Sequence, residues 1–302
     1  MEKRPLVSII IRTRNRQEKL KKCIAALLRL DYPNYNIVCV TDNCSDGTVS
    51  YLDQTYGADE RFTIVHNRKH ISSAYMYNLG IKHSTGDIVV FIDDDAMADK
   101  NCIREIVDSF LNHPKVVCVG GAVYSPGSNK MDNEGLFIGC LLAFKRSIFE
   151  QFSFDENLIY SHFHDEGDLI QRLRAEKYKL LFHDKAFVIH DRGADPQDAS
   201  PELPELNHIY SRLKESSLVK YYFSLLYYSL AGIWAWHSDT IRFFTRRLRV
   251  LSSRLSEFEP AVFNMRLKLR LIYILLIEIP VKAKRRRVEE LKMRDRKVRE
   301  RD

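Results

Sequence analysis

The feature that most constrains the fold is a short apolar run that ends in three adjacent carboxylates. Residues 88–92 are Ile-Val-Val-Phe-Ile, and Asp93, Asp94 and Asp95 follow directly. A short run rich in β-branched residues is typical of a strand that is buried on both faces of a parallel sheet. We therefore expect the three carboxylates at the carboxyl edge of a sheet, where the ligand crevices of open α/β sheets lie.

Three adjacent carboxylates repel one another and need a counter-charge close to a low-dielectric core. A hard divalent cation, which prefers oxygen ligands, is the natural counter-charge. Because side chains alternate along an extended backbone, Asp93 and Asp95 are expected on one side and Asp94 on the other. Two carboxylates can then serve one metal site while the third has another role. A solvated acidic turn is the alternative interpretation.

The rest of the N-terminal two thirds alternates between strand and helix patterns. Strands are expected at 6–11, 36–40, 62–66, 116–119, 180–182 and 186–189, and helices at 20–28, 73–82, 101–111 and from about 165 onward. This alternation predicts an α/β fold with helices on both faces of a parallel sheet. Asn15 followed by Glu18 predicts a capping box at the start of the first helix.

Six cysteines occur without paired or metal-type spacing, and several lie within apolar runs. They are interpreted as buried free thiols, which favours a reducing compartment. The first residues lead directly into a strand pattern, so no secretory leader is expected. A length of 302 residues with 45% hydrophobic residues allows one large domain or one domain with an appendage.

The charge is unevenly distributed. Residues 241–302 carry 19 Lys/Arg against 8 Asp/Glu, whereas the first 240 residues are slightly acidic. A basic C-terminal segment predicts contact with an anionic partner.

Five motifs in order resemble those of glycosyltransferase family 2, in particular its glycan-assembly and rhamnosyltransferase-like enzymes. They are residues 7–16, 40–48, 78–81, the run into the DXD-type motif at 93–95, and 165–173, and the pattern closes at His190. The resemblance covers residues 5–195. It implies the GT-A fold, a Rossmann-like, mostly parallel mixed sheet with helices on both faces, for residues 1–205. Outside the resemblance, the charge and apolar pattern of residues 206–302 predict a helical, basic region.

The resemblance implies an inverting, metal-dependent hexosyltransferase that uses a nucleotide-diphosphate sugar. It places the nucleotide base at Thr13 and Asp42, and the ribose at Asp93 or Asp94. It places Mg²⁺ or Mn²⁺ at Asp95, with His190 as a further ligand, although a lone strand-end histidine is as often structural. Further donor-binding candidates are Arg14, Asn15, Arg16, Asn43, Arg68 and Asn78, of which Asn15 as a helix cap and Arg16 and Arg68 as solvated arginines are the alternatives.

The catalytic base of such enzymes is the second residue of an acidic pair, which is Glu166 here. Many members of the family have Asp at that position with Glu before it, and this chain has the reversed order, Asp165-Glu166. A glutamate reaches about one methylene further than an aspartate, so the acceptor sits slightly further away, or Asp165 shares the role. A positioned carboxylate can take the proton of the acceptor hydroxyl as a general base.

The C-terminal region suits an interfacial association with a membrane. Residues 218–236 are long enough to span a bilayer, but tyrosines run through their first half. Residues 271–281 are apolar, and the basic cluster 282–287 follows. We expect peripheral binding to the anionic cytoplasmic leaflet, near a lipid-linked or cell-surface glycan acceptor. A packed helical subdomain or a homo-oligomer interface is the alternative.

Three other functions fit parts of the sequence. A sugar-nucleotide nucleotidyltransferase would share the sheet and the aspartates, but residues 12–16 lack the expected glycines. A nucleic-acid-binding protein would use the basic tail and leave Asp93–Asp95 without a purpose. A zinc site would use His162, His164, His183 and His190. The sugar, the nucleotide base, the acceptor and the oligomeric state are not indicated by the sequence.

Overall fold

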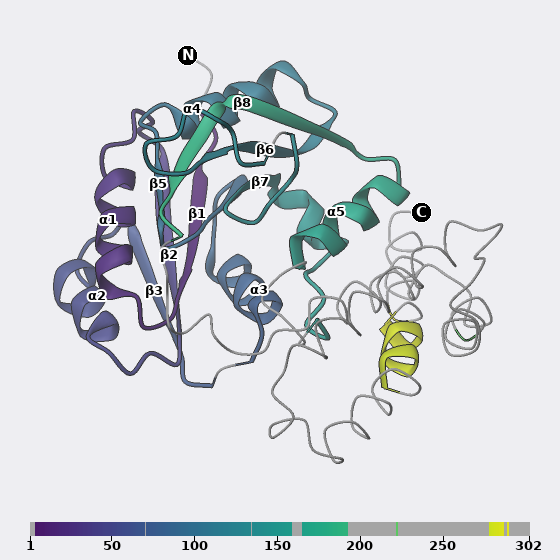
Figure 1. Ribbon diagram of the computed structural model, residues 1–302, viewed down its shortest axis with the longest axis horizontal. Coiled ribbons are helices and arrows are strands. Elements are labelled where there is room, and N and C mark those ends of the chain that lie inside the picture. The colour runs from purple at the N-terminus through teal and green to yellow at the C-terminus, as the bar shows by residue number, and fades with distance from the viewer. Residues whose placement is uncertain are drawn as a thin grey trace. The chain divides into compact units, whose positions relative to one another are not determined.

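The computed structural model describes residues 4–69, 71–133, 135–158, 165–192, 222, 278–286 and 289. The chain separates into two compact units, and Figure 1 shows the helices and strands of the first. One unit is formed by Met1–Glu156 with Asp165–Ser200, and the other by Asn157–His164 with Pro201–Asp302. The predicted domain boundary at residue 205 lies outside the described residues, and so does the apolar segment 218–236 apart from Tyr222.

A mixed sheet, eight-stranded over the described residues, forms the centre of the first unit. In spatial order its strands are β3 (Phe62–Asn67), β2 (Tyr35–Asp42), β1 (Val7–Thr13), β4 (Ile88–Ile92), β7 (Leu141–Lys145), β6 (Val116–Tyr124), β8 (Lys179–His190) and β5 (Ala96–Ala98). Neighbours from β3 to β4 are parallel, as are β6 and β8. β7 runs antiparallel to β4 and β6, and β5 antiparallel to β8. The predicted mostly parallel, mixed α/β sheet is confirmed.

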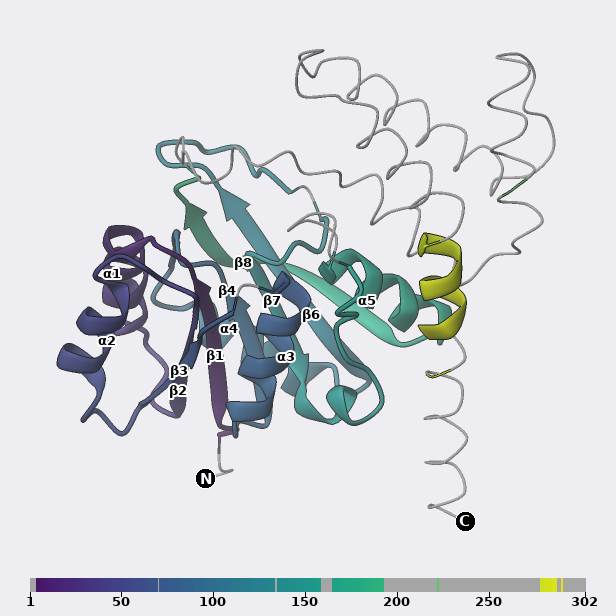
Figure 2. The same ribbon diagram turned by 90° about the horizontal axis from the view of Figure 1, so that it is seen from below.

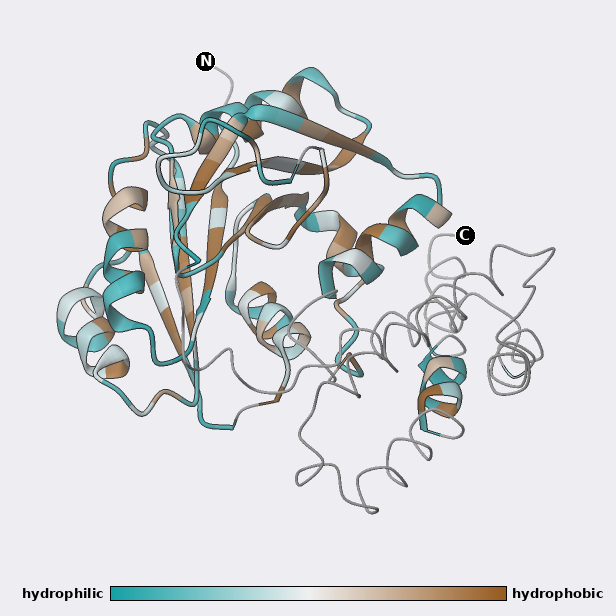
Figure 3. Ribbon diagram, in the orientation of Figure 1, coloured by the Kyte–Doolittle hydropathy of each residue, from teal (hydrophilic) through white to brown (hydrophobic). Residues whose placement is uncertain are grey.

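Helices cover both faces of this sheet. α1 (Gln17–Leu27), α2 (Thr48–Tyr56) and α4 (Cys102–Asn112) contribute to one hydrophobic cluster, with residues such as Leu20, Leu52 and Ile106. α3 (Ser73–His83), the 3₁₀ helix η1 (Arg146–Glu150) and α5 (Asp165–Ala175) contribute to a second cluster. Figure 3 shows apolar strands between helices with polar outer surfaces. The sheet is therefore buried on both sides.

Side-chain alternation divides each central strand between the two clusters. In β1, Ile9 and Ile11 lie in the α1 cluster while Ile10 lies in the α3 cluster. In β4, Val90 lies in the α1 cluster and Phe91 in the α3 cluster. This period of two explains why both strands are continuously apolar: each of their residues faces a helix layer.

Two predictions of local structure are wrong. The capping box is absent: Arg16 is the N-cap residue of α1 and its side chain makes no capping bond. Asn15 instead has a left-handed backbone conformation, φ 51°, and its amide oxygen accepts a hydrogen bond from the Ser45 backbone N–H at 2.6 Å. The two strands expected at 180–182 and 186–189 form one strand, β8, with an irregularity opposite Gly121 and Ala122.

The cysteines agree with the prediction from sequence. All six are free thiols, and five of them are buried, Cys44 being half-buried.

The second unit contains a helical run at residues 278–286. Within it, Lys282 Nζ donates to Glu278 Oε1 at 2.8 Å, one helical turn away. In the described part of the chain, no helix combines the length and apolar character needed to cross a membrane.

Helix α3 packs closely on the sheet because Gly80 lacks a side chain. The helix lies along β1 and β2 (Figure 2). A Cβ atom at position 80 would lie 2.5 Å from Ile10 Cγ2 and 3.4 Å from Val40 Cγ2. Both side chains are fully buried, so neither has room to move aside.

We expect Gly80→Ala to lower the free energy of unfolding. Alanine gains about 1 kcal/mol in helix propensity over glycine, whereas overpacking a core costs roughly 1–3 kcal/mol. The net loss should therefore be about 1 kcal/mol, measured by urea denaturation. Lys82→Ala, on the exposed part of the same helix, is the control and should change little. A raised midpoint for Gly80→Ala would contradict this packing.

Candidate active site

The carboxyl ends of three parallel strands bring the predicted polar residues to one edge of the sheet. β1 pairs with both β2 and β4, so Thr13, Asp42 and Asp93 end or follow neighbouring strands. Alternation along β1 places Thr13 on the α1 side, like Ile11, and Arg12 on the α3 side, like Ile10. The carboxyl edge of the sheet therefore has two halves. The α1 half lies on the side that α1 covers, and the α5 half lies on the side that α3 and α5 cover.

On the α1 side, Asp94 is held by Thr13. The Thr13 hydroxyl donates to Asp94 Oδ2 at 2.7 Å, and Arg16 Nη1 lies 3.4 Å from Oδ1. Asp94 is only 4% exposed. Burial raises the pKa of Asp94 to about 6, although the Thr13 hydrogen bond and Arg16 act in the opposite direction. The contacts with Thr13 and Arg16 therefore hold the Asp94 side chain in one orientation.

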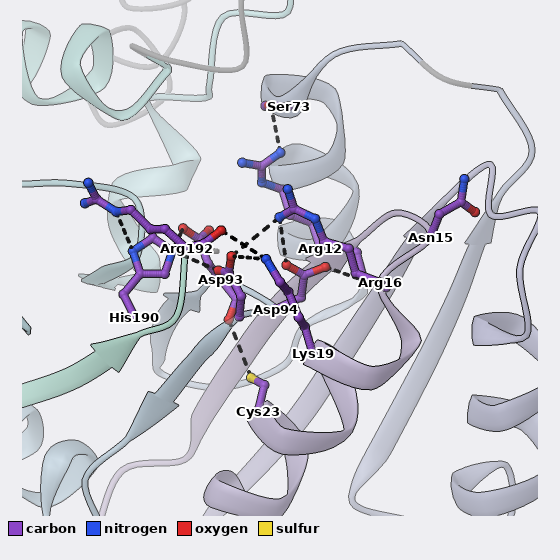
Figure 4. A network of polar contacts seen from close by, with 12 residues as sticks. Arg12, Asn15, Arg16, Lys19, Cys23, Ser73, Asp93, Asp94, His190 and Arg192 are labelled. Carbon is purple, nitrogen blue, oxygen red and sulfur yellow. Dashed lines mark hydrogen bonds and ion pairs between the residues drawn. The ribbon is translucent and has the colours of Figure 1, made fainter. Parts of the chain in front are cut away.

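Asp95 lies between His190 on one side and Lys19 on the other, and Figure 4 shows these two side chains. His190 Nε2 is 2.8 Å from Asp95 Oδ1, and Lys19 Nζ is 3.5 Å from Oδ2. Burial alone would raise the pKa of Asp95, but the His190 hydrogen bond, with Arg16 and Lys19, lowers it. Arg192 Nε donates to His190 Nδ1 at 3.2 Å. Because this Nδ1 accepts, Nε2 carries the ring proton and donates it to Asp95.

Asp93 lies near His190 as well. Its Oδ2 is 3.8 Å from His190 Nε2, so Asp93 and Asp95 both approach this histidine while Asp94 bonds to Thr13. The carboxylates diverge as expected, but residues 93–96 form a turn closed by the hydrogen bond from the Ala96 N–H to the Asp93 carbonyl at 3.1 Å, and not the extended segment that the prediction assumed. Asp93, Cys140 and His190 form a group whose ligand atoms all lie within 4.8 Å of one another.

The acidic pair opens α5 on the other side of the sheet. Asp165 is fully buried, and in the described part of the chain neither of its carboxylate oxygens has a hydrogen-bond partner. Burial raises the pKa of Asp165 well above its usual range, and the neighbouring Glu166 adds to the rise. Arg12, which faces this side, acts in the opposite direction.

Arg12 is fixed by two contacts with α3. Its Nη1 donates to Ser73 Oγ at 2.9 Å, and the guanidinium lies 5.0 Å from the centre of the Tyr77 ring. Burial opposes the charge of Arg12, but Tyr77, Asp93 and Asp165 outweigh burial and raise its pKa. Arg12 is therefore a permanent positive charge between the two acidic groups.

Glu166 lies against Gly139 and close to Tyr77. A Cβ atom at Gly139 would lie 3.0 Å from the Tyr77 hydroxyl and 3.5 Å from the Glu166 carboxyl carbon. Burial raises the pKa of Glu166, and hydrogen bonds from backbone N–H groups, including that of Gly139, partly offset the rise. A half-buried carboxylate with a raised pKa is suited to accept a proton.

The donor atoms around His190 fit a divalent metal. Two carboxylates and an imidazole suit Mn²⁺, and carboxylates with water suit Mg²⁺. The alternative zinc site is not assembled by the described residues, because His183 Nε2 bonds to Glu105 Oε2 at 2.8 Å instead. His162 and His164 lie outside the described residues.

Other candidates from the sequence have structural contacts. Asp42 is buried, and its Oδ1 accepts from Asn67 Nδ2 at 3.4 Å. Asn15 ties the loop after β1 to the loop after β2 through Ser45. Asn78 Nδ2 donates to the Phe154 carbonyl at 3.0 Å and to Glu156 Oε1 at 2.8 Å. The Asn78 amide therefore fixes residues 154–156 to α3 instead of facing the carboxylates.

Three further donor-binding candidates are exposed. They are Arg14, Asn43 and Arg68. Asn43 has a left-handed backbone conformation, φ 48°, in the turn after β2. These positions belong to the rim of the edge.

Sequence reasoning missed several residues at this edge. They are Arg12, Lys19, Tyr77, Cys140 and Arg192. The sequence does contain a signal for Arg12, since a charged residue at the end of an apolar strand is unusual unless it has a partner. The sequence contains no such signal for Cys140, because its neighbours Asp93 and His190 are distant in sequence.

The fold is shared with solved glycosyltransferases. The mannosyltransferase PcManGT from Pyrobaculum calidifontis, in complex with GDP-Man and Mn²⁺, is similar with a TM-score of 0.55 and 16% identity, covering 95% of this chain and 88% of that one. S. aureus TarS 1–349 in complex with UDP-GlcNAc is similar with a TM-score of 0.54 and 14% identity, covering 83% and 71%. These likenesses show the GT-A fold.

Curated relatives match part of the chain. The glucosyl-dolichyl phosphate glucuronosyltransferase of Haloferax volcanii is 29% identical over 119 residues, 39% of this chain and 38% of that protein. The putative colanic acid biosynthesis glycosyl transferase WcaA of Escherichia coli is 30% identical over 138 residues, 42% and 49%. The chain thus spans less than half the length of these relatives.

A family model matches more than half of the chain. The model is that of glycosyl transferase family 2, and it matches residues 8–171. The matched region includes β1, the Asp93–Asp95 motif and the acidic pair at the start of α5. The chain therefore belongs to glycosyltransferase family 2.

Proposed function

We propose that this protein is an inverting, divalent-metal-dependent glycosyltransferase that moves a sugar from a nucleoside diphosphate sugar to an acceptor hydroxyl. The observation that carries the proposal is that one sheet edge holds both Asp93–Asp95 with His190 and the acidic pair of buried Asp165 and half-buried Glu166. The GDP-Man and Mn²⁺ of the archaeal mannosyltransferase, and the UDP-GlcNAc of TarS, support a donor of this class.

The α1 half of the edge is assigned to the donor. Thr13 and Asp42 would contact the nucleotide base, and Asp93 or Asp94 the ribose. Asp95 and His190 would hold Mg²⁺ or Mn²⁺, which supplies positive charge for the leaving nucleoside diphosphate. Arg16 and Lys19, which lie 3.7 and 3.5 Å from Asp95 Oδ2, are placed to exchange that contact for the donor phosphates.

The α5 half is assigned to the acceptor. Glu166 would take the proton from the acceptor hydroxyl, because its raised pKa makes it a stronger base than a solvated carboxylate. The Gly139 N–H and Tyr77 restrict the orientation of its carboxylate. Attack by the activated hydroxyl on the face opposite the leaving group inverts the anomeric centre. Burial raises the pKa of Asp165 and so favours its neutral form, which supports Glu166 as the base.

A lipid-linked or cell-surface glycan is the acceptor class that we propose. The names of the relatives in Haloferax volcanii and Escherichia coli refer to a dolichyl phosphate sugar and to colanic acid. The basic C-terminal segment suits an enzyme that acts at an anionic membrane surface on the cytoplasmic face.

Binding of the donor should require the metal. We expect one nucleoside diphosphate or its sugar, added with Mn²⁺, to raise Tm by roughly 5 °C at about 100 times Kd. The shift should disappear with a chelator and in Asp95→Asn, but persist in Asp184→Asn, an exposed control with the same change of charge. Thermal shift measures it. Equal shifts with and without chelator would contradict the role of the metal.

Glu166→Gln should abolish transfer and leave donor binding intact. Loss of a general base costs about 100-fold or more in kcat, while the thermal shift with nucleotide and Mn²⁺ should match that of the unmodified protein. Glu60→Gln, an exposed exchange of the same kind, is the control. Full turnover by Glu166→Gln, measured as release of nucleoside diphosphate, would remove this residue from the mechanism.

The membrane association should depend on salt. We expect the full chain to sediment with phosphatidylglycerol vesicles at low ionic strength, and to be released by added salt, because each basic residue near the surface contributes about 1 kcal/mol. Phosphatidylcholine vesicles are the control. A chain that stays in the supernatant with both kinds of vesicle would exclude the peripheral association.

A further inference from the structure

Cys140 lies where a metal ligand would lie. It directly precedes β7, whose antiparallel pairing sets Ile92 opposite Leu141, so the next pair along is Asp93 and Cys140. β5 pairs Ala96 with His190 and brings that histidine to the same place. The juxtaposition therefore follows from the backbone register of strands that are far apart in sequence.

The three side chains offer ligand atoms of three kinds. The Cys140 sulfur, an Asp93 carboxylate oxygen and a His190 ring nitrogen lie within 4.8 Å of one another, and in the described part of the chain no other group of this kind is found. Asp93 Oδ2 and His190 Nε2 are 3.8 Å apart. With metal–ligand bonds of about 2.0–2.3 Å, the edges of a tetrahedral site are roughly 3.3–3.6 Å long. Small side-chain shifts would therefore complete the geometry.

The environment of Cys140 differs from that of the other buried cysteines. Cys140 is 3% exposed yet lies beside Asp93 and His190. Cys23, which also lies near this edge, donates its S–H to the Asp93 backbone carbonyl at 3.5 Å. Cys102 belongs to the same apolar cluster as Cys140, but it is not grouped with a carboxylate and an imidazole. Only Cys140, among the described cysteines, is grouped with metal-binding side chains.

We propose that Cys140 binds the divalent metal of this site through its sulfur, together with Asp93 and His190, so that the ribose contact assigned above to Asp93 or Asp94 would fall to Asp94. This rests on the metal-dependent function proposed above. A thiolate ligand favours borderline metals such as Zn²⁺ and Co²⁺ over Mg²⁺. The metal preference of this site would then differ from that of a site built only from carboxylates and imidazole.

Coordination by Cys140 would also couple the metal to the base. Gly139, the preceding residue, donates its N–H to Glu166 and lies against that carboxylate. A metal bound to the Cys140 sulfur would restrain this two-residue segment, and with it the orientation of Glu166. Binding through His190 Nε2 requires the ring proton to move to Nδ1, so the hydrogen bond from Arg192 would have to break.

Cobalt spectroscopy on the full chain tests the proposal without measuring transfer. Co²⁺ is titrated with and without UDP or GDP, in the presence of a phosphine reductant. We expect visible d–d bands together with a near-ultraviolet sulfur-to-cobalt charge-transfer band. Cys140→Ala should lose that band and bind Co²⁺ at least about tenfold more weakly. Cys102→Ala, which removes an equally buried thiol, should keep the band and the affinity.

The outcomes separate this proposal from the one on which it rests. Visible bands without the sulfur band, or a sulfur band that persists in Cys140→Ala, would overturn the role of Cys140 and leave a metal-dependent enzyme standing. No Co²⁺ binding with either nucleotide would overturn both proposals. Asp93→Asn is a second variant, which should weaken Co²⁺ binding while the sulfur band remains at saturation. Circular dichroism checks that each variant folds.

Discussion

The structure depends on how it compensates the negative charge gathered at one edge of the sheet. Asp93, Asp94 and Asp95 follow a fully buried strand, and Asp165 and Glu166 open a helix on the opposite face. Charged groups near a low-dielectric core are costly unless they are paired. Here the compensation comes from strand ends and helices: Thr13 and Arg16 at Asp94, Lys19 and His190 at Asp95, and Arg12 between the two acidic groups.

The period of two along a strand organises this compensation. Since both faces of the sheet carry helices, consecutive residues at a strand end lie in different surroundings. Thr13 faces α1 and binds Asp94, whereas Arg12 faces α3 and stacks on Tyr77. Thr13 in the proposed donor half and Arg12 in the proposed acceptor half are therefore adjacent in sequence, but they lie on opposite sides of the sheet edge. Gly139 and Cys140 connect the halves, one beside Glu166 and the other beside His190.

Much of the architecture could be predicted from local patterns, and the failures have a common cause. The strand at 88–92 and the helix from 165 came from apolar periodicity, which depends on nearby residues alone. The capping box failed because Asn15 satisfies backbone N–H groups of Ser45 and Asp46, 30 residues away, instead of those in its own helix. Asn78 was expected beside the donor, but its amide fixes the Phe154 backbone. In both cases a tertiary contact outweighed the local pattern.

The sequence by itself determined the alternation of strands and helices, the burial of both faces of the sheet and the presence of carboxylates at its carboxyl edge. These follow from side-chain period and from chain direction, which are local properties. The tertiary structure alone decided that His190 meets Asp93 and Asp95, that Arg12 lies on Tyr77 beside Asp165, and that Cys140 joins Asp93. Those contacts depend on the order and register of the strands β4, β7, β8 and β5, which no stretch of sequence encodes alone, because hydrogen-bond pairing between distant strands is settled only when the whole sheet assembles.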